Sequence, residues 1–217
     1  MGGMRYEAIT WGRMAGRLAR HLDGLAPGDG GDRLKVALDG APAAGGGELA
    51  GLLAEQLRDR GRAAHVVDTA GFLRPASLRY EHGRRDPDSY YAGWTDTGAL
   101  WREVFTPLEP GGTGRVLPDL WDPVKDRATR SPYVTLPPGG VLLLHGPFLL
   151  GHWFPFDLTV HLRLSPAALA RRGEEWTLPA FARYETEADP AGAADVVVRA
   201  DDPRHPAWTG LGALGSD

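Results

Sequence analysis

The sequence predicts an α/β fold, a doubly wound, five-stranded parallel sheet with a small β-hairpin insertion. Two observations favour it: short apolar runs alternate with segments of helical periodicity, and a glycine-rich turn joins the first apolar run to a helix. With 217 residues, of which 42% are hydrophobic and 24% charged, the chain is long enough to bury one substantial core. We therefore expect a single domain over residues 1–217, with its core at about 33–206.

The first elements predict a strand–helix–strand unit. Apolar residues recur at helical spacing over residues 5–24, which indicates an amphipathic N-terminal helix. A strand is expected at 34–38, a helix at 48–60 and a second strand at 64–67. The crossover between these two strands should be right-handed.

The second half of the chain predicts the rest of the sheet. Residues 77–138 are rich in aromatic residues, then in Gly and Pro, and we expect an insertion that is helical before Pro107 and contains a β-hairpin after it. The most apolar run, residues 141–144, indicates a central strand, and further strands are expected at 158–164 and 195–198. A helix over 165–172 should lie between these last two strands.

Composition limits the classes of function. A net charge of -4 and a pI near 6.0 give no general attraction for nucleic acid or for an anionic membrane. The absence of cysteine excludes disulfides and thiolate metal sites, and no histidine pair has the spacing of a zinc protease, so no metal site is expected. With no signal-like or membrane-spanning apolar run, we expect a cytoplasmic protein whose partner is a small molecule. The sequence leaves the oligomeric state open.

Two polar residues at strand ends are candidate catalytic groups, because ligands of doubly wound sheets bind at the carboxyl ends of the strands. Asp39 ends the first strand, where its carboxylate could hold a water, a metal or a hydroxyl, or could cap the turn at Gly40. His145 directly follows the run 141–144, so it points into the cleft or is hydrogen-bonded in the core. If the two approach each other across adjacent strands, the carboxylate would orient the imidazole.

The turn after the first strand has the spacing of a phosphate-binding loop. Gly40 and Gly45 match the two glycines of G-x-x-x-x-G-K-[ST], whereas Gly46 and Gly47 stand at the Lys and Ser/Thr positions. The backbone of this loop, Ala43 and Ala44 included, could still bind an anion at the start of the following helix. Glu48 in the first helical turn would repel a phosphate, so a purely structural turn is the alternative.

Further ligand contacts are expected from an arginine and an aromatic residue. Arg74 is a candidate contact for an acidic ligand beside the cleft. Tyr91, with its aromatic neighbours, could contact a substrate or stack on a base, although aromatic residues at helical spacing are more often core.

Five motifs, taken in order, resemble the uridine kinase-like P-loop proteins of actinobacteria over about residues 33–206. They are Asp39-Gly40, Phe72-Leu73-Arg74-Pro75, Asp86-Pro87-Asp88-Ser89-Tyr90-Tyr91, Leu144-His145-Gly146-Pro147-Phe148-Leu149-Leu150 and Ala194-Asp195-Val196-Val197-Val198. The resemblance implies a sheet of the P-loop nucleoside kinase type, Mg-ATP on the loop, and a nucleoside or another small hydroxyl compound in the neighbouring cleft.

The chain departs from that family's pattern at several positions. In such kinases the loop Lys reaches the β- and γ-phosphates and the Ser/Thr hydroxyl holds Mg²⁺, which Gly46 and Gly47 cannot do. Where relatives usually carry Asp-Asp-Phe after the second strand, this chain has Ala70-Gly71-Phe72, and His145 stands where relatives often have an acid. The lid between the last helix and the last strand looks short, and it leaves Arg171 and Arg172 as the candidate phosphate clamps.

Three functional hypotheses follow. The first is a protein with a degenerate P-loop that binds a nucleoside or phosphorylated metabolite and lacks ordinary ATP-dependent kinase activity. The second is an active phosphotransferase of the uridine kinase type with a non-standard ATP site, and ATP and Mg²⁺ are expected as cofactors only in that case. The third is an ATP-independent enzyme that uses His145 as acid or base.

Overall fold

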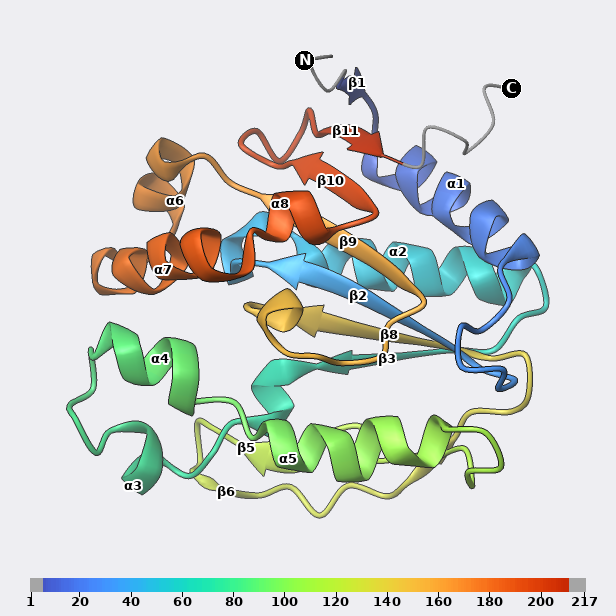
Figure 1. The fold of residues 1–217 in the computed structure, drawn as a ribbon, viewed down its shortest axis with the longest axis horizontal. Coiled ribbons are helices and arrows are strands. Elements are labelled where there is room, and N and C mark those ends of the chain that lie inside the picture. Colours follow the sequence, from blue (N-terminus) through green and yellow to red (C-terminus); the bar gives the residue numbers. More distant parts are fainter. Residues whose placement is uncertain (1–5, 211–217) are drawn as a thin grey trace.

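The computed structural model describes residues 6–210, which form a central sheet flanked by helices (Figure 1). Its strands are β1 (Glu7–Ala8), β2 (Leu34–Gly40), β3 (Ala64–Asp68), β8 (Val141–Gly146), β9 (Leu158–Arg163), β10 (Val196–Arg199) and β11 (Ala207–Gly210). They lie in the order β1-β11-β10-β9-β2-β8-β3. The five strands from β10 to β3 are parallel, as predicted, whereas β11 and β1 add antiparallel strands that the sequence did not predict.

Helices connect the strands and cover both faces of the sheet. They are α1 (Trp11–Gly24), α2 (Gly46–Asp59), α3 (Ala76–Arg79), α4 (Pro87–Gly93), α5 (Thr97–Leu100), α6 (Pro166–Arg172), α7 (Leu178–Ala188) and α8 (Pro190–Ala193). A π-helical turn at Trp101–Phe105 and a 3-10 turn at Thr106–Leu108 extend α5. None of the helices of residues 6–210 is long and apolar enough to cross a membrane.

The N-terminal helix is shorter than expected. The prediction placed its start at residue 5, which lies outside the described residues, and the structure begins α1 at Trp11. The hydroxyl of Thr10 accepts a hydrogen bond from the backbone N–H of Arg13 and so caps the helix. The preceding residues Glu7–Ala8 pair with β11 instead of joining the helix.

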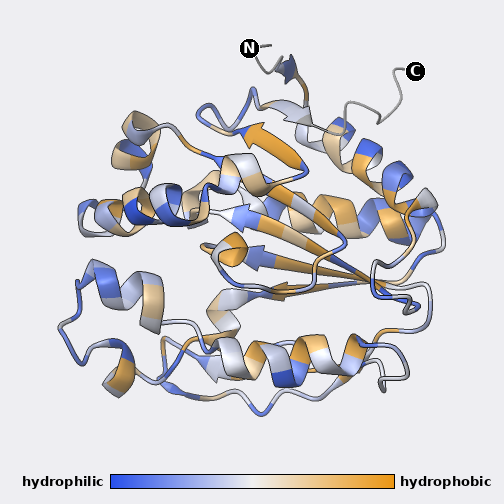
Figure 2. Cartoon of the chain, viewed as in Figure 1, coloured by the Kyte–Doolittle hydropathy of each residue, from blue (hydrophilic) through white to orange (hydrophobic). Residues whose placement is uncertain are grey.

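Alternation along the strands divides the core into two layers (Figure 2). Val36 and Leu38 of β2 face α1 and α2, whereas Ala37 faces the layer built by the α5 segment. The predicted insertion completes that second layer. Its hairpin region forms two small antiparallel pairs, β4 (Arg115–Val116) with β7 (Val134–Thr135) and β5 (Trp121–Asp122) with β6 (Arg127–Ala128).

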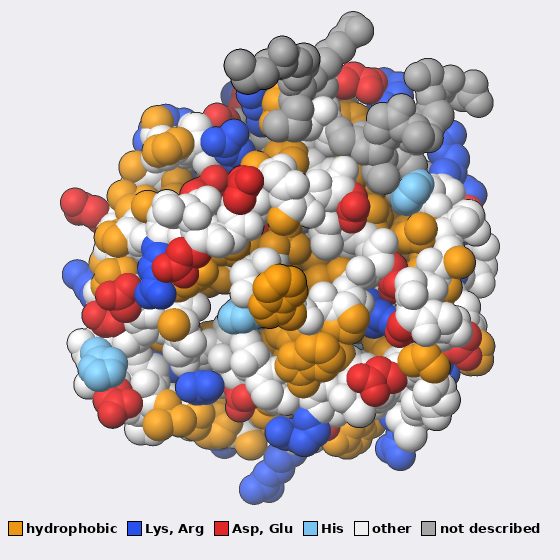
Figure 3. Space-filling model, viewed as in Figure 1, with side chains coloured by type: hydrophobic (Ala, Val, Ile, Leu, Met, Phe, Trp, Pro, Cys, Tyr) orange, Lys and Arg blue, Asp and Glu red, His pale blue; other side chains and the backbone are white. Residues whose placement is uncertain are grey.

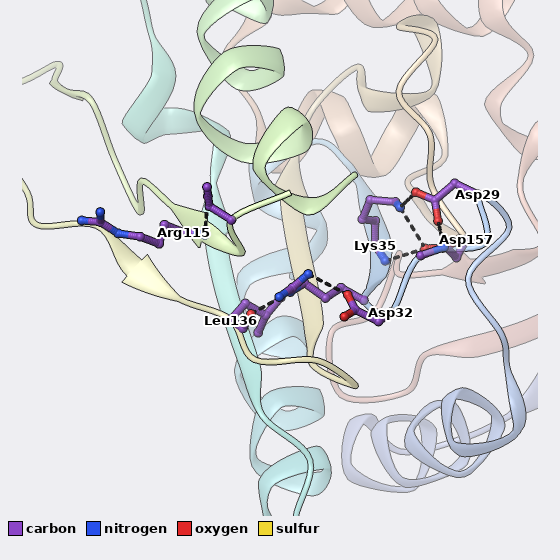
Figure 4. A network of polar contacts seen from close by, with 9 residues as sticks. Asp29, Asp32, Lys35, Arg115, Leu136 and Asp157 are labelled. Atoms are coloured by element: carbon purple, nitrogen blue, oxygen red, sulfur yellow. Dashed lines mark hydrogen bonds and ion pairs between the residues drawn. The ribbon is translucent and has the colours of Figure 1, made fainter. Parts of the chain in front are cut away.

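A polar network closes the amino end of β2 (Figure 4). The Nζ of Lys35, a side chain that is almost fully buried, lies 2.6 Å from Oδ2 of Asp29 and 3.8 Å from Oδ2 of Asp157. Asp157 also accepts the backbone N–H groups of Gly28 and Lys35, each at 2.7 Å. Because every charge here has a partner within the fold, we assign this network to structure.

The carboxyl ends of the strands are covered by α7 and α4 (Figure 1). A cluster of buried residues joins α7 to the loops, and Arg183 of α7 forms an ion pair with Asp88 of α4 at 3.0 Å. Its members are Ala41, Phe148, Ala180, Phe181 and Tyr184. The sequence had predicted only the helix over 165–172 between β9 and β10, so α7, which covers this end of the sheet, was not anticipated.

Candidate functional site

The loop after β2 joins this strand to α2 through a 3-10 turn flanked by two glycines with positive φ. Gly40 has a φ of +153°, and a Cβ at this position would come within 2.6 Å of the carbonyl oxygen of Leu162, so only glycine fits. A 3-10 turn follows at Pro42–Ala44, closed by a hydrogen bond from the N–H of Ala44 to the carbonyl of Ala41. Gly45, in the left-handed conformation, precedes α2 as its N-cap residue.

The three candidate arginines lie in different surroundings. The guanidinium of Arg172 donates hydrogen bonds to the carbonyl oxygens of Ala43 and Ala200, and so ties the loop to the end of β10. Arg171 is exposed on α6. Arg74 lies on a separate, open groove with Glu81 and Asp86. Arg172 thus holds the loop in place, whereas Arg74 does not line the cavity at the start of α2.

A cavity of about 300 Å³, here called the α2 cavity, opens at the start of α2. In the space-filling view the surface is hollowed between α7 and α4 (Figure 3). Among the described residues that line the cavity, none is Lys or Arg. The lining consists of Gly40, Ala41, Pro42, Gly46, Gly47, Asp68, Thr69, Ala70, Leu73, Tyr90, Trp94, Thr95, His145, Gly146, Pro147 and Phe148.

The imidazole of His145 lies against the first turn of α2. A Cβ at Gly47 would stand 3.3 Å from Cε1 of His145, which is tighter than ordinary contact, and a Cβ at Gly46 would stand 3.8 Å from Cβ of His145. On its other side, Nε2 of His145 lies 3.9 Å from Oδ2 of Asp68. His145 and Asp68 thus form the polar end of the α2 cavity.

Asp39 is not exposed in this cavity. Its side chain is fully buried and accepts three hydrogen bonds: from the backbone N–H of Leu149 at 2.8 Å, from the hydroxyl of Tyr184 at 2.9 Å and from Nδ1 of His161 at 2.6 Å. The expectation that Asp39 orients His145 is therefore wrong about the partner, because the carboxylate orients His161.

Strand register explains this pairing. Asp39 lies in register with His161 on β9, whereas His145 lies in register with Leu38 on β2 and with Asp68 on β3. Because side chains of neighbouring residues point to opposite faces, Asp39 and His161 share the face covered by α7. His145 shares the other face with α2.

Burial and hydrogen bonding determine the protonation states of His161 and Tyr184, the two side chains that contact Asp39. Burial disfavours the charge on His161, but its contacts with the carboxylates of Asp39 and Glu185 outweigh burial and raise the pKa of the imidazole to about 9. Burial and the charge of Asp39 raise the pKa of the Tyr184 hydroxyl far above its ordinary value. At neutral pH the group is therefore an imidazolium held by a buried carboxylate beside a neutral phenol.

Aromatic side chains form the wall of the α2 cavity opposite α2. Tyr90 and Trp94 line it, with their ring centroids 5.0 Å apart in an edge-on arrangement. The Nε1 of Trp94 is buried and has no hydrogen-bond partner among residues 6–210. Tyr91 instead packs on Phe148 at 5.1 Å, beneath the guanidinium of Arg183, and does not line the cavity.

Sequence reasoning missed two residues of this region. They are His161 and Tyr184, which hold Asp39. A polar residue within the apolar strand at 158–164 was the available signal for His161. No group of His, Asp and Glu side chains suited to a metal ion occurs within residues 6–210.

Comparison with known proteins shows which solved structures share this fold. No protein-family model matches the sequence, and no curated protein matches it. A possible uridine kinase from Bacillus stearothermophilus matches in structure with a TM-score of 0.69 and 22% identity, over 85% of this chain and 97% of that one. A protein assigned as a fructose transport system kinase from Silicibacter sp. TM1040 matches with a TM-score of 0.56 and 23% identity, over 85% and 92%. This chain therefore has the α/β fold of P-loop kinases.

Proposed function

We propose that the chain is a small-molecule binding protein with a degenerate P-loop, which takes a nucleoside-sized ligand in the α2 cavity and lacks ordinary ATP-dependent phosphoryl transfer. The observation that carries this proposal is the composition of the cavity at the start of α2. The imidazole of His145 lies over Gly47, and none of the described lining residues is Lys or Arg.

The residues present do not fit a magnesium-bound triphosphate. A P-loop kinase uses a Lys for the β- and γ-phosphates and a hydroxyl for Mg²⁺, and these positions hold Gly46 and Gly47. Each charge-assisted hydrogen bond is worth about 1.5–3 kcal/mol, and about 1.4 kcal/mol is a factor of ten in affinity. The loss of both contacts should weaken nucleotide binding by about a hundredfold or more.

Two further side chains oppose a phosphate at this place. Glu48, exposed in the first turn of α2, puts a negative charge where the helix N-terminus would otherwise favour an anion. Arg172, one of the two expected clamps, donates from both of its terminal nitrogens to backbone carbonyls. We infer that the loop has the spacing of a phosphate cradle without the Lys and Ser/Thr side chains that such a loop carries.

The rest of the cavity suits an uncharged planar molecule. Tyr90, Trp94 and Phe148 give it aromatic walls, and the unpartnered indole N–H of Trp94 offers one donor. Asp68 and Thr69 offer acceptors for hydroxyl groups at the other end. An aromatic base with a hydroxyl-bearing sugar combines these features, which is why we propose a nucleoside.

Calorimetric titration with uridine tests the ligand class. We expect wild-type protein to bind uridine, and Trp94→Phe, which keeps a ring but removes the donor, to bind it about threefold to tenfold more weakly. Trp176→Phe is the matched control, because Trp176 packs on Trp94 but does not line the cavity. Absence of uridine binding, or equal affinities for the two variants, would remove the support for a nucleoside.

One observation favours a second function, an ATP-independent reaction with His145 as acid or base. His145 and Asp68 lie 3.9 Å apart within the α2 cavity, so a bound hydroxyl could meet an imidazole whose partner is a carboxylate. His145→Gln should then abolish conversion of a bound nucleoside while it leaves binding intact. Unchanged uridine after prolonged incubation with wild-type protein argues against this function for that compound.

A further inference from the structure

A second cavity, here called the β9–α7 cavity, lies on the opposite side of the loop at Gly40 and Ala41. It has a volume of about 460 Å³ and shares only these two residues with the lining of the α2 cavity. Its walls are mainly apolar and come from the end of β9 and from α6 and α7. They include Leu162, Leu164, Pro166, Leu169, Leu178 and Phe181.

One lining residue of this cavity carries a buried polar atom without a partner. His161 is 3% exposed, and its Nδ1 is held by Asp39. Its Nε2 has no hydrogen-bond partner among residues 6–210, and Oε1 of Glu185, which also lines the cavity, is 3.8 Å away. An unsatisfied buried donor is costly, so such an atom at a cavity wall points to a ligand that completes it.

The charges around the cavity limit the ligand to a neutral molecule. The imidazolium of His161 lies between the carboxylates of Asp39 and Glu185, and the charge of Arg163 acts on Glu185 as well. The two positive groups, on His161 and Arg163, thus already balance the two carboxylates. A charged ligand would leave one charge uncompensated in a mainly apolar cavity, and this is unfavourable.

We propose that the β9–α7 cavity is a second ligand site, for a neutral and mainly apolar molecule with one hydroxyl group. The hydroxyl oxygen accepts a hydrogen bond from Nε2 of His161, and its O–H donates a hydrogen bond to the carboxylate of Glu185. The apolar part of the molecule lies among the leucines and Phe181. This site is independent of the nucleoside proposed for the α2 cavity, because neither His161 nor Glu185 lines that cavity.

Titration followed by amide NMR tests the site with two probes of similar size, benzyl alcohol and ethylbenzene. Both should shift the amide signals of Leu169 and Phe181 in the wild-type protein. In His161→Asn the side-chain amide takes the place of Nδ1 and keeps the bond to Asp39, but nothing replaces Nε2. We expect this variant to bind benzyl alcohol about threefold to tenfold more weakly and ethylbenzene no more weakly than wild type.

Two other variants complete the experiment. His161→Gln places an amide nitrogen near Nε2 and should retain benzyl alcohol binding, whereas Leu169→Trp fills the cavity and should remove binding of both probes. Uridine titration of each variant reports on the α2 cavity separately. The inference is overturned if neither probe shifts these amides up to its solubility, or if His161→Asn weakens both probes equally.

Discussion

The carboxylate of Asp39 and the imidazole of His161 lie 2.6 Å apart between two neighbouring parallel strands, β2 and β9. Tyr184 of α7 donates to the same carboxylate oxygen, and the backbone of Leu149 donates to the other. Asp39, at the carboxyl end of β2, thus holds together a strand pair, the loop after β8 and α7. Asp39 therefore connects the elements that meet at the carboxyl end of the sheet.

The charge of Asp39 should be important for stability. Asp39→Asn removes one partner of a buried ion pair, and such losses cost about 3–5 kcal/mol. We therefore expect a loss of this size in the free energy of unfolding, measured with urea. Asp88→Asn is the control, because the Asp88–Arg183 pair is exposed and should be worth less than about 1 kcal/mol. Equal effects of the two substitutions would contradict this role of Asp39.

Stability should fall as the pH rises above neutrality. The pKa of His161 is about 9 in the folded protein and has an ordinary value of 6.5. Below pH 6.5 both states carry the proton and the stabilisation is complete, whereas between 6.5 and 9 only the folded state keeps it. The free energy of unfolding should then decrease by about 1.4 kcal/mol per pH unit until the folded state also loses the proton.

Urea unfolding at a series of pH values from 6 to 10 measures this slope. The same series on His161→Asn is the control, because asparagine has no proton to lose in this range. A wild-type slope no steeper than that of the variant would show that His161 is not held in its charged form.

The imidazole of His145 should restrict the room for a side chain at position 47 but not at position 46. Replacing glycine by alanine in a helix stabilises a protein by about 0.5–1 kcal/mol where the Cβ fits. We expect this gain for Gly46→Ala, whereas Gly47→Ala should gain less, because its Cβ would stand 3.3 Å from the imidazole. Thermal unfolding in the wild-type and His145→Ala backgrounds checks this, and Gly47→Ala should recover the full gain in the second. Equal gains in both backgrounds would contradict the contact.

Arg172 should hold the loop rather than a ligand. Arg172→Lys cannot reach the carbonyls of both Ala43 and Ala200, so we expect faster hydrogen exchange of the amides in residues 43–47 and a loss of about 1–3 kcal/mol in stability. Arg171→Lys, on the exposed side of the same helix, is the matched control and should change neither quantity. If both variants exchange like wild type, the loop does not depend on Arg172.

The sheet could be predicted from the sequence because its signals are local. Five apolar runs, separated by turns and helical periodicity, gave the parallel strands at nearly their observed positions. The strands Glu7–Ala8 and Ala207–Gly210 could not be found in this way, since such short strands are defined by pairing between distant parts of the chain. Helix α7 carried a recognisable signal, because Phe181, Tyr184 and Ala188 recur at helical spacing after Pro179.

The candidate site could be predicted in part. The position of Asp39 at a strand end followed from the apolar run at 34–38, and the turn before α2 followed from the glycines at 40 and 45–47. The histidine that Asp39 binds did not follow, because two histidines end neighbouring strands and only the register decides which shares its face. Alternation gives the face of a side chain relative to its own strand, but the alignment of separate strands comes from tertiary packing.

Calorimetric titration of the wild-type protein with Mg-ATP tests the central claim, that the fold is kept without ordinary ATP-dependent phosphoryl transfer. The account predicts no binding in the low micromolar range and no ADP formed when uridine, Mg²⁺ and ATP are incubated with the protein. Low micromolar affinity for Mg-ATP, together with ADP released in proportion to phosphorylated uridine, would contradict it and would establish a phosphotransferase with a non-standard ATP site.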